Sequence, residues 1–171
     1  MPFNPEDVLK GRMAESLVNE LLRACGNKVY RFGYETVLQN LTQLEQTFER
    51  YTKTSKIIRS IPDLVVVNKK GEPFFVEVKF RTERGKPWFD KKEWDELKNI
   101  LKYWGASCIL VTTKHPYFLI FDETTFKNGR NTFISLENDK KFDILLKKLE
   151  KFQSLVGEYY HKTDRKAGEK I

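Results

Sequence analysis

Hydrophobic residues recur along the chain at two different spacings, and these spacings predict a mixture of helices and strands. Near the start, apolar residues at helical intervals predict a helix from about Pro5 to Cys25. Asn4 is a good N-cap, Pro5 suits the first helical position, and Gly26 is a natural stop. The same spacing predicts three further helices, which cover Thr36–Tyr51, Asp90–Trp104 and Asp139–Val156.

Short apolar or alternating runs predict the strands. They are Val29–Phe32, Asp63–Val67, Phe74–Phe80, Ser107–Thr112 and Tyr117–Phe121. The second and third of these runs flank the turn-rich residues 68–72, so we expect them to form a hairpin. The polar, basic stretch Thr52–Arg59 favours neither state. The order of helix, strand, helical insert, two strands, helix, two strands and helix predicts a mixed α/β fold.

Length and composition narrow the class of protein. The 171 residues fit a single domain over residues 1–160, with a helical, basic insert at 33–61 and a flexible basic tail at 161–171. No apolar run approaches the roughly eighteen residues that span a bilayer, and the start lacks the features of a signal peptide. We therefore expect a cytoplasmic protein without a membrane partner, in which Cys25 and Cys108 are buried thiols rather than one disulfide.

The charge distribution favours a polyanionic partner. The net charge is +7 and the isoelectric point is near 9.3, which suits nucleic acid. Six Lys and Arg residues lie between Lys79 and Lys92, with Trp88 and Phe89 among them. Aromatic rings among cations can stack on exposed bases. A solvated loop with a partly buried Trp is the alternative.

Polar residues that interrupt the apolar patterns are the candidates for chemistry. Alternation along Phe74–Phe80 places Glu77 and Lys79 on one face, about 6.6 Å apart at roughly 3.3 Å per residue. Asp63 follows Pro62 at the mouth of the other hairpin strand, which brings it towards Lys79. The alternatives are an ordinary solvent-facing strand and an aspartate that serves only the turn.

A third carboxylate lies on the first predicted helix. At 100° per residue, Glu15 falls between Leu22 and Val8, at the edge of the apolar arc. A solvated glutamate is the alternative, but from this edge the carboxylate can turn towards the hairpin. Three carboxylates suit Mg²⁺, or Mn²⁺ as a substitute, because hard oxygen ligands hold these ions. Such a metal polarises a phosphate and lowers the pKa of its bound water, and a lysine beside it can orient or deprotonate the attacking water.

These residues resemble the motif of the PD-(D/E)XK nuclease superfamily, which includes restriction endonucleases and archaeal Holliday junction resolvases. The match consists of Glu15, Pro62-Asp63 and Glu77-Val78-Lys79, and small resolvases look nearest through the stretch from Gly11 to Glu15. The resemblance covers Pro5 to Val111. It implies a restriction-endonuclease-like α-β-β-β-α-β core, a mixed central sheet flanked by helices, an insert after the first strand and a C-terminal helix.

The resemblance also implies roles for these residues. Asp63, Glu77 and the Val78 carbonyl would bind the metal, Glu15 would bind it directly or through water, and Lys79 would handle the nucleophile. The implied activity is metal-dependent endonuclease cleavage of DNA, including branched DNA. The alternative is an inactive nucleic-acid-binding module on the same fold. Many relatives act as dimers, so a homodimer is compatible with the resemblance, and the sequence does not distinguish DNA from RNA.

The candidate nucleic-acid contacts are basic and aromatic residues around this site. They are Arg12, Arg59, Arg81, Arg84, Lys86, Trp88 and Lys92. For Arg12 and Arg59 the alternative is a solvated arginine. The helix after the Glu-x-Lys strand can lend a polar side chain such as Lys92 or Glu96. The segment between Phe32 and Pro62 is longer than in small resolvases, which leaves specificity for junctions open.

Overall fold

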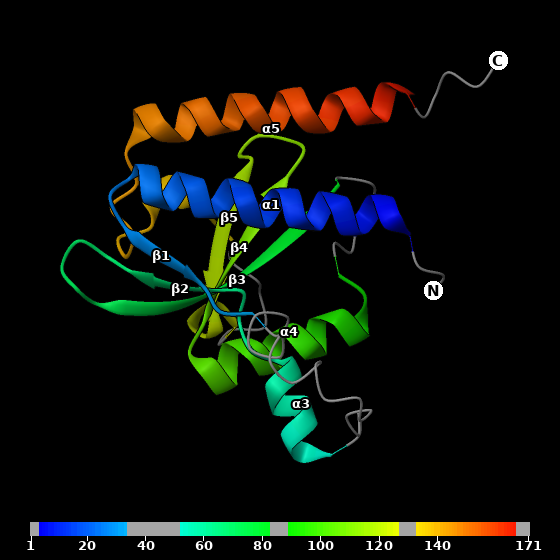
Figure 1. The fold of residues 1–171 in the computed structure, drawn as a ribbon, viewed down its shortest axis with the longest axis vertical. Coiled ribbons are helices and arrows are strands. Elements are labelled where there is room, and N and C mark those ends of the chain that lie inside the picture. Colours follow the sequence, from blue (N-terminus) through cyan, green and yellow to red (C-terminus); the bar gives the residue numbers. More distant parts are fainter. Residues whose placement is uncertain (1–3, 34–51, 83–88, 127–132, 167–171) are drawn as a thin grey trace, which may run out of the picture.

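The computed structural model describes residues 4–33, 52–82, 89–126 and 133–166, which form a mixed six-stranded sheet flanked by helices (Figure 1). The strands are β1 (Lys28–Arg31), β2 (Leu64–Val67), β3 (Pro73–Arg81), β4 (Ser107–Thr112), β5 (Phe118–Asp122) and β6 (Ile134–Ser135). The helices are α1 (Pro5–Ala24), α3 (Lys53–Arg59), α4 (Lys91–Trp104) and α5 (Leu146–Lys166), with 3-10 turns η1 (Glu123–Phe126) and η2 (Leu136–Asn138).

The predicted fold class is confirmed. The strands lie in the sheet in chain order. With α3 in the insert between β1 and β2, the elements α1, β1, β2, β3, α4 and β4 reproduce the predicted α-β-β-β-α-β core. β2 and β3 form the predicted antiparallel hairpin, with Leu64 opposite Val76. β3 and β4 are parallel, because α4 carries the chain back across the sheet between them.

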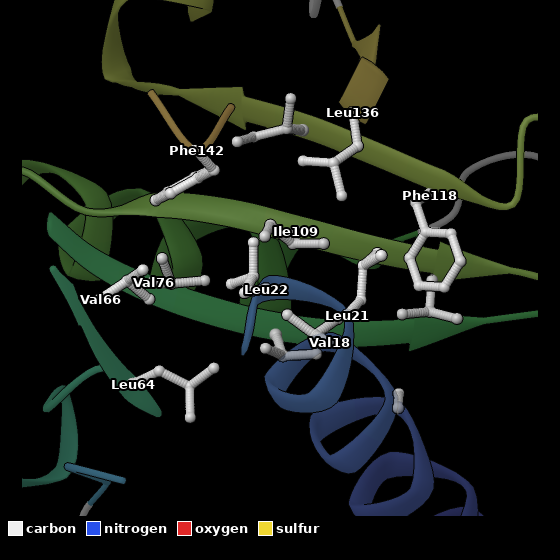
Figure 2. Close-up of a cluster of buried hydrophobic side chains, with 14 of the residues drawn as sticks. Val18, Leu21, Leu22, Leu64, Val66, Val76, Ile109, Phe118, Leu136 and Phe142 are labelled. Atoms are coloured by element: carbon white, nitrogen blue, oxygen red, sulfur yellow. The ribbon is translucent and has the colours of Figure 1, made fainter. Parts of the chain in front are cut away.

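Helices α1 and α5 cover one face of the sheet. Asn4 caps α1 by accepting a hydrogen bond from the Glu6 N–H, and Gly26 follows the helix with a φ of +91°. Ala14, Val18, Leu21 and Leu22 of α1 are fully buried, and the last three are directed at the strands (Figure 2). The buried residues that pack together on this face include Val76, Ile109, Phe118 and Phe142.

Helix α4 covers the other face. Its N-terminus has a reciprocal capping box between Asp90 and Glu93, and Gly105 ends it in the left-handed conformation. Leu97 and Leu101 pack against Cys108 and the strand residues beside it. Both cysteines are buried and free, as predicted. Among the described residues, no helix combines the length and apolar character needed to cross a membrane.

Two elements of the structure were not predicted, and one predicted element cannot be compared with it. Lys53–Arg59, which the pattern left unassigned, is helix α3, and its N-cap is the Thr52 hydroxyl. The strand β6 was not predicted. The predicted helix Thr36–Tyr51 lies outside the described residues.

The last helix is displaced along the chain from its predicted bounds. It begins at Leu146 rather than Asp139 and continues to Lys166, into the expected tail. The buried Phe142 instead belongs to a turn, where its carbonyl accepts a hydrogen bond from the Asn27 amide. Because Phe142 is seven residues before Leu149, its position fits the helical period even though its backbone is not helical.

Candidate active site

The hairpin places Asp63 against the middle of β3. Asp63 directly precedes β2, and its carboxylate accepts a hydrogen bond of 2.7 Å from the Val78 N–H. Its own carbonyl accepts hydrogen bonds from the Phe32 and Gly33 N–H groups at the end of β1. Asp63 is therefore fixed by hydrogen bonds to β3 and to the residues that follow β1.

Glu77 and Lys79 project from the same face of β3, as alternation predicts. The Lys79 ammonium lies 2.5 Å from Glu77 Oε1. Glu77 is only 4% exposed, so this carboxylate is nearly removed from water. A buried carboxylate requires a nearby positive charge, and Lys79 provides one.

Negative charge is concentrated around Asp63. Burial, together with the neighbouring Glu77 charge, raises the pKa of Asp63 to about 8. Lys79 and the Val78 N–H act in the opposite direction, and Glu15 adds a further increase. Burial and the neighbouring carboxylates together therefore outweigh the lysine and the backbone donor at Asp63.

Lys79 is a firmly charged cation. Burial would lower the pKa of its ammonium, but the carboxylates of Glu77 and Asp63 outweigh burial and raise this pKa above its usual value. A charged ammonium donates hydrogen bonds and cannot accept a proton. Of the two roles expected for Lys79, the structure therefore favours orienting a nucleophile over deprotonating it.

Glu15 lies on the other wall of the same cleft. The cleft has a volume of about 1250 Å³ and is bounded by α1, α3, α4 and the ends of the first three strands. Glu15, Asp63, Glu77 and Lys79 all line it. Glu15 is half-buried, and its charge contributes to the raised pKa of Asp63. The tertiary fold thus brings the four predicted residues into one cleft.

The side chains of the cleft can supply some, but not all, of the oxygen ligands of a magnesium ion. Within the described ranges, no three His, Cys, Asp or Glu side chains lie close enough to hold a metal as they stand. Mg²⁺ is commonly held by one or two carboxylates together with waters and substrate phosphates. Asp63 and Glu77 can supply two. The Val78 carbonyl faces the same edge of β3 as its N–H, and so lies on the side of Asp63.

Among the residues predicted to contact nucleic acid whose side chains the structure describes, two line the cleft and one does not. Arg12 is exposed and lines the cleft on α1. Arg81 also lines it, but its guanidinium is 2.8 Å from Glu93 and lies over the Phe89 ring, so a phosphate contact would require breaking that pair. Lys92 is exposed in the first turn of α4 and is not among the residues that line the cleft, so its contact with nucleic acid stays a prediction.

The remaining predicted contacts are not described by the structure. Arg59 ends α3, but its side chain lies outside the described part of the chain. Arg84, Lys86 and Trp88 all fall in the segment 83–88, which is also outside it.

Several cleft residues were missed from the sequence. Lys53 and Lys56 line the cleft from α3, Arg31 from β1 and Tyr103 from α4. The spacing of three between Lys53 and Lys56 places both on one side of a helix. Together with Thr52 as a possible N-cap, that spacing was a signal for a basic helix beside the site.

Comparisons with known proteins show a distant structural similarity to a solved structure. No protein-family model and no curated protein matches the chain. Among solved structures, the chain is similar to Hjc, a Holliday junction resolvase from Archaeoglobus fulgidus, with 18% sequence identity and a TM-score of 0.37. The match covers 82% of this chain and 98% of Hjc. At this distance, the similarity assigns no residue and no activity to the present protein.

Proposed function

We propose that this protein is a metal-dependent endonuclease that hydrolyses phosphodiester bonds in DNA. The observation that carries the proposal is the meeting of Asp63, Glu77 and Lys79 in one cleft, with Glu15 on its other wall. A structural ion pair has no need of a surplus of buried carboxylates. A site that binds a metal cation and a phosphate needs these carboxylates, because they hold the metal, and the metal and Lys79 together neutralise their charge.

Asp63, Glu77 and the Val78 carbonyl would hold Mg²⁺, or Mn²⁺ in its place. When bound, the metal would polarise the scissile phosphate and lower the pKa of a coordinated water. The hydrogen bond from the Val78 N–H fixes the orientation of the Asp63 carboxylate, which supports this assignment. Glu15 would contribute from α1, directly or through a water.

The protein's own cations would position the DNA and the nucleophile. Lys79, held by Glu77, would donate a hydrogen bond to the attacking water or to the charged phosphate. Arg12, Lys53 and Lys56 line the cleft as exposed cations and would bind the flanking phosphates.

Cleavage assays with matched variants test this proposal. Supercoiled plasmid and branched DNA are incubated with the protein in Mg²⁺, Mn²⁺ or EDTA. We expect nicking that requires the metal and is lost in Asp63→Ala and Lys79→Ala. The controls are Asp95→Ala and Lys98→Ala, which change exposed residues of α4 that do not line the cleft. If Asp63→Ala and Lys79→Ala cut as fast as the parent, the proposal is wrong.

One observation favours a second candidate, an inactive nucleic-acid-binding module. Lys79 already neutralises Glu77, and the described carboxylates do not form a ready-made triad. This candidate predicts tight, salt-sensitive DNA binding without metal-dependent cleavage of any substrate. It also predicts that Mg²⁺ leaves the melting temperature unchanged, whereas a metal that binds only the folded state raises it.

A further inference from the structure

Tyr103 is an exposed aromatic residue on the wall of the cleft. Its side chain is 67% exposed, more than any other large hydrophobic residue in the described part of the chain. It nevertheless lines the same cleft as Asp63, Glu77 and Lys79. The cleft therefore offers an open ring face to whatever occupies it.

The neighbouring residue fixes the position of Tyr103. Trp104 packs edge-on against Phe32 and Phe75, with ring centroids 5.7 and 5.2 Å away. Its indole N–H also donates a hydrogen bond of 3.3 Å to the Ser60 hydroxyl, just after α3. The end of α4 is thus anchored at two points. Tyr103 directly precedes Trp104, so its side chain is rotated by about 100° around the helix axis. It faces the cleft, away from the aromatic cluster of Trp104, Phe32 and Phe75.

Helix α3 completes the surface around the ring. Ile57 lies one turn before Ser60, whose hydroxyl donates to the Ile57 carbonyl, and its side chain is 42% exposed. Lys53 and Lys56, both exposed, line the cleft from the same helix. An aromatic ring, an aliphatic side chain and two cations therefore border one side of the cleft. Helix α3 lies beside α4 there (Figure 1), and Ser60 is hydrogen-bonded to Trp104.

We propose that Tyr103 and Ile57 form a stacking platform for an unpaired base, with Lys53 and Lys56 on the flanking phosphates. Aromatic rings among cations bind single strands in this way, because every base has a π-face. Bases within a duplex are already stacked on each other and cannot reach the ring. The inference rests on the proposed nuclease function and deepens it, because it specifies DNA with a single-stranded segment beside a duplex as the substrate.

Binding in EDTA tests the platform independently of hydrolysis. The probe is a forked DNA with 2-aminopurine at the first unpaired position, compared with a fully paired duplex of equal length. We expect tighter binding of the fork and a change in 2-aminopurine fluorescence on binding. Tyr103→Ala should weaken fork binding by about 5- to 150-fold, the effect of losing one base–aromatic stack. Duplex affinity should stay within about twofold, and Tyr103→Phe should retain the parent behaviour because the ring remains.

Tyr159→Ala is the matched control, because Tyr159 is an exposed tyrosine on α5 that does not line this cleft. The platform is refuted if Tyr103→Ala leaves fork binding intact, if it weakens fork and duplex equally, or if the parent binds neither DNA. Metal-dependent cleavage that depends on Asp63 would then still support the nuclease. Conversely, fork binding that depends on Tyr103, without cleavage in any metal, would support the platform and refute the nuclease.

Discussion

Two lysine–carboxylate pairs on opposite faces of the sheet look alike in length but differ in their surroundings. Lys79 and Glu77 lie on the face covered by α4, 2.5 Å apart. Lys141 and Asp122 lie on the face covered by α1 and α5, 2.6 Å apart. Distance alone therefore does not separate a functional pair from a structural one.

The balance of donors and acceptors separates them. Lys141 also donates to the Ser107 hydroxyl, and Asp122 also accepts from Thr124. Burial opposes the charge of Asp122, but the hydrogen bonds from Lys141 and Thr124 outweigh it and lower the pKa of this carboxyl. In the cleft, burial and the neighbouring carboxylates raise the pKa of Asp63 instead. This surplus of buried acid is the difference on which our proposal of a functional cleft rests.

The largest contrast is expected between Glu77→Gln and Asp122→Asn. We expect Glu77→Gln to lower the cleavage rate by about 100- to 1000-fold, because a proposed metal ligand that stabilises the transition state electrostatically is lost. The substitution also removes the repulsion between the Glu77 and Asp63 carboxylates. Asp122→Asn should leave cleavage unchanged and reduce the free energy of unfolding by about 1 kcal/mol, since the pair is partly exposed. Single-turnover cleavage and urea unfolding measure the two effects. Loss of activity in Asp122→Asn, without unfolding, would remove the distinction between the pairs.

The second contrast is the dependence of stability on pH in EDTA. The pKa of Asp63 is about 8 in the folded protein against 3.8 unfolded, so the folded state binds more protons between these values and stability falls as pH rises from about 4 to 8. Asp63→Asn should flatten this decline. For Asp122 the lowered pKa has the opposite sign: its contribution is present above the unfolded value of 3.8 and is lost as pH falls through the folded pKa. Melting temperatures from pH 3 to 9 check both signs.

The third contrast is the response to metal. At 100 times its dissociation constant, Mg²⁺ would stabilise the parent by about 2.7 kcal/mol, because it binds the folded state only. This stabilisation should raise the melting temperature of the parent when Mg²⁺ is added. The increase should be mostly lost in Glu77→Gln and retained in Asp122→Asn. Equal responses in the two variants would place the metal somewhere other than the cleft.

The smallest effect is expected for cations on the cleft wall. Replacing Lys53 and Lys56 together by Ala should reduce the slope of log affinity against log salt by about 1.4 for single-stranded DNA, since each single-strand phosphate contact contributes about 0.7. The matched control replaces Lys148 and Lys151, two exposed lysines of α5 that line a groove against α1. A similar loss in both double variants would indicate a diffuse charge effect instead of a defined path.

Local patterns along the chain were enough for most of the fold. The caps Asn4 and Asp90, the stops Gly26 and Gly105, and the alternation of β3 act over a few residues, so the sequence alone predicted these elements. The start of α5 could not be found this way. Phe142 keeps the helical period, but its backbone is held in a turn by Asn27, 115 residues earlier in the chain.

For the candidate site, the sequence by itself determined which side chains share a face of β3, because neighbouring positions on a strand alternate. Only the tertiary structure decided what surrounds them. It placed α3 beside the cleft, paired Arg81 with Glu93, and kept Lys79 charged between two carboxylates. Charge state and access depend on burial and on partners distant in the chain, and no local pattern of residues specifies either one.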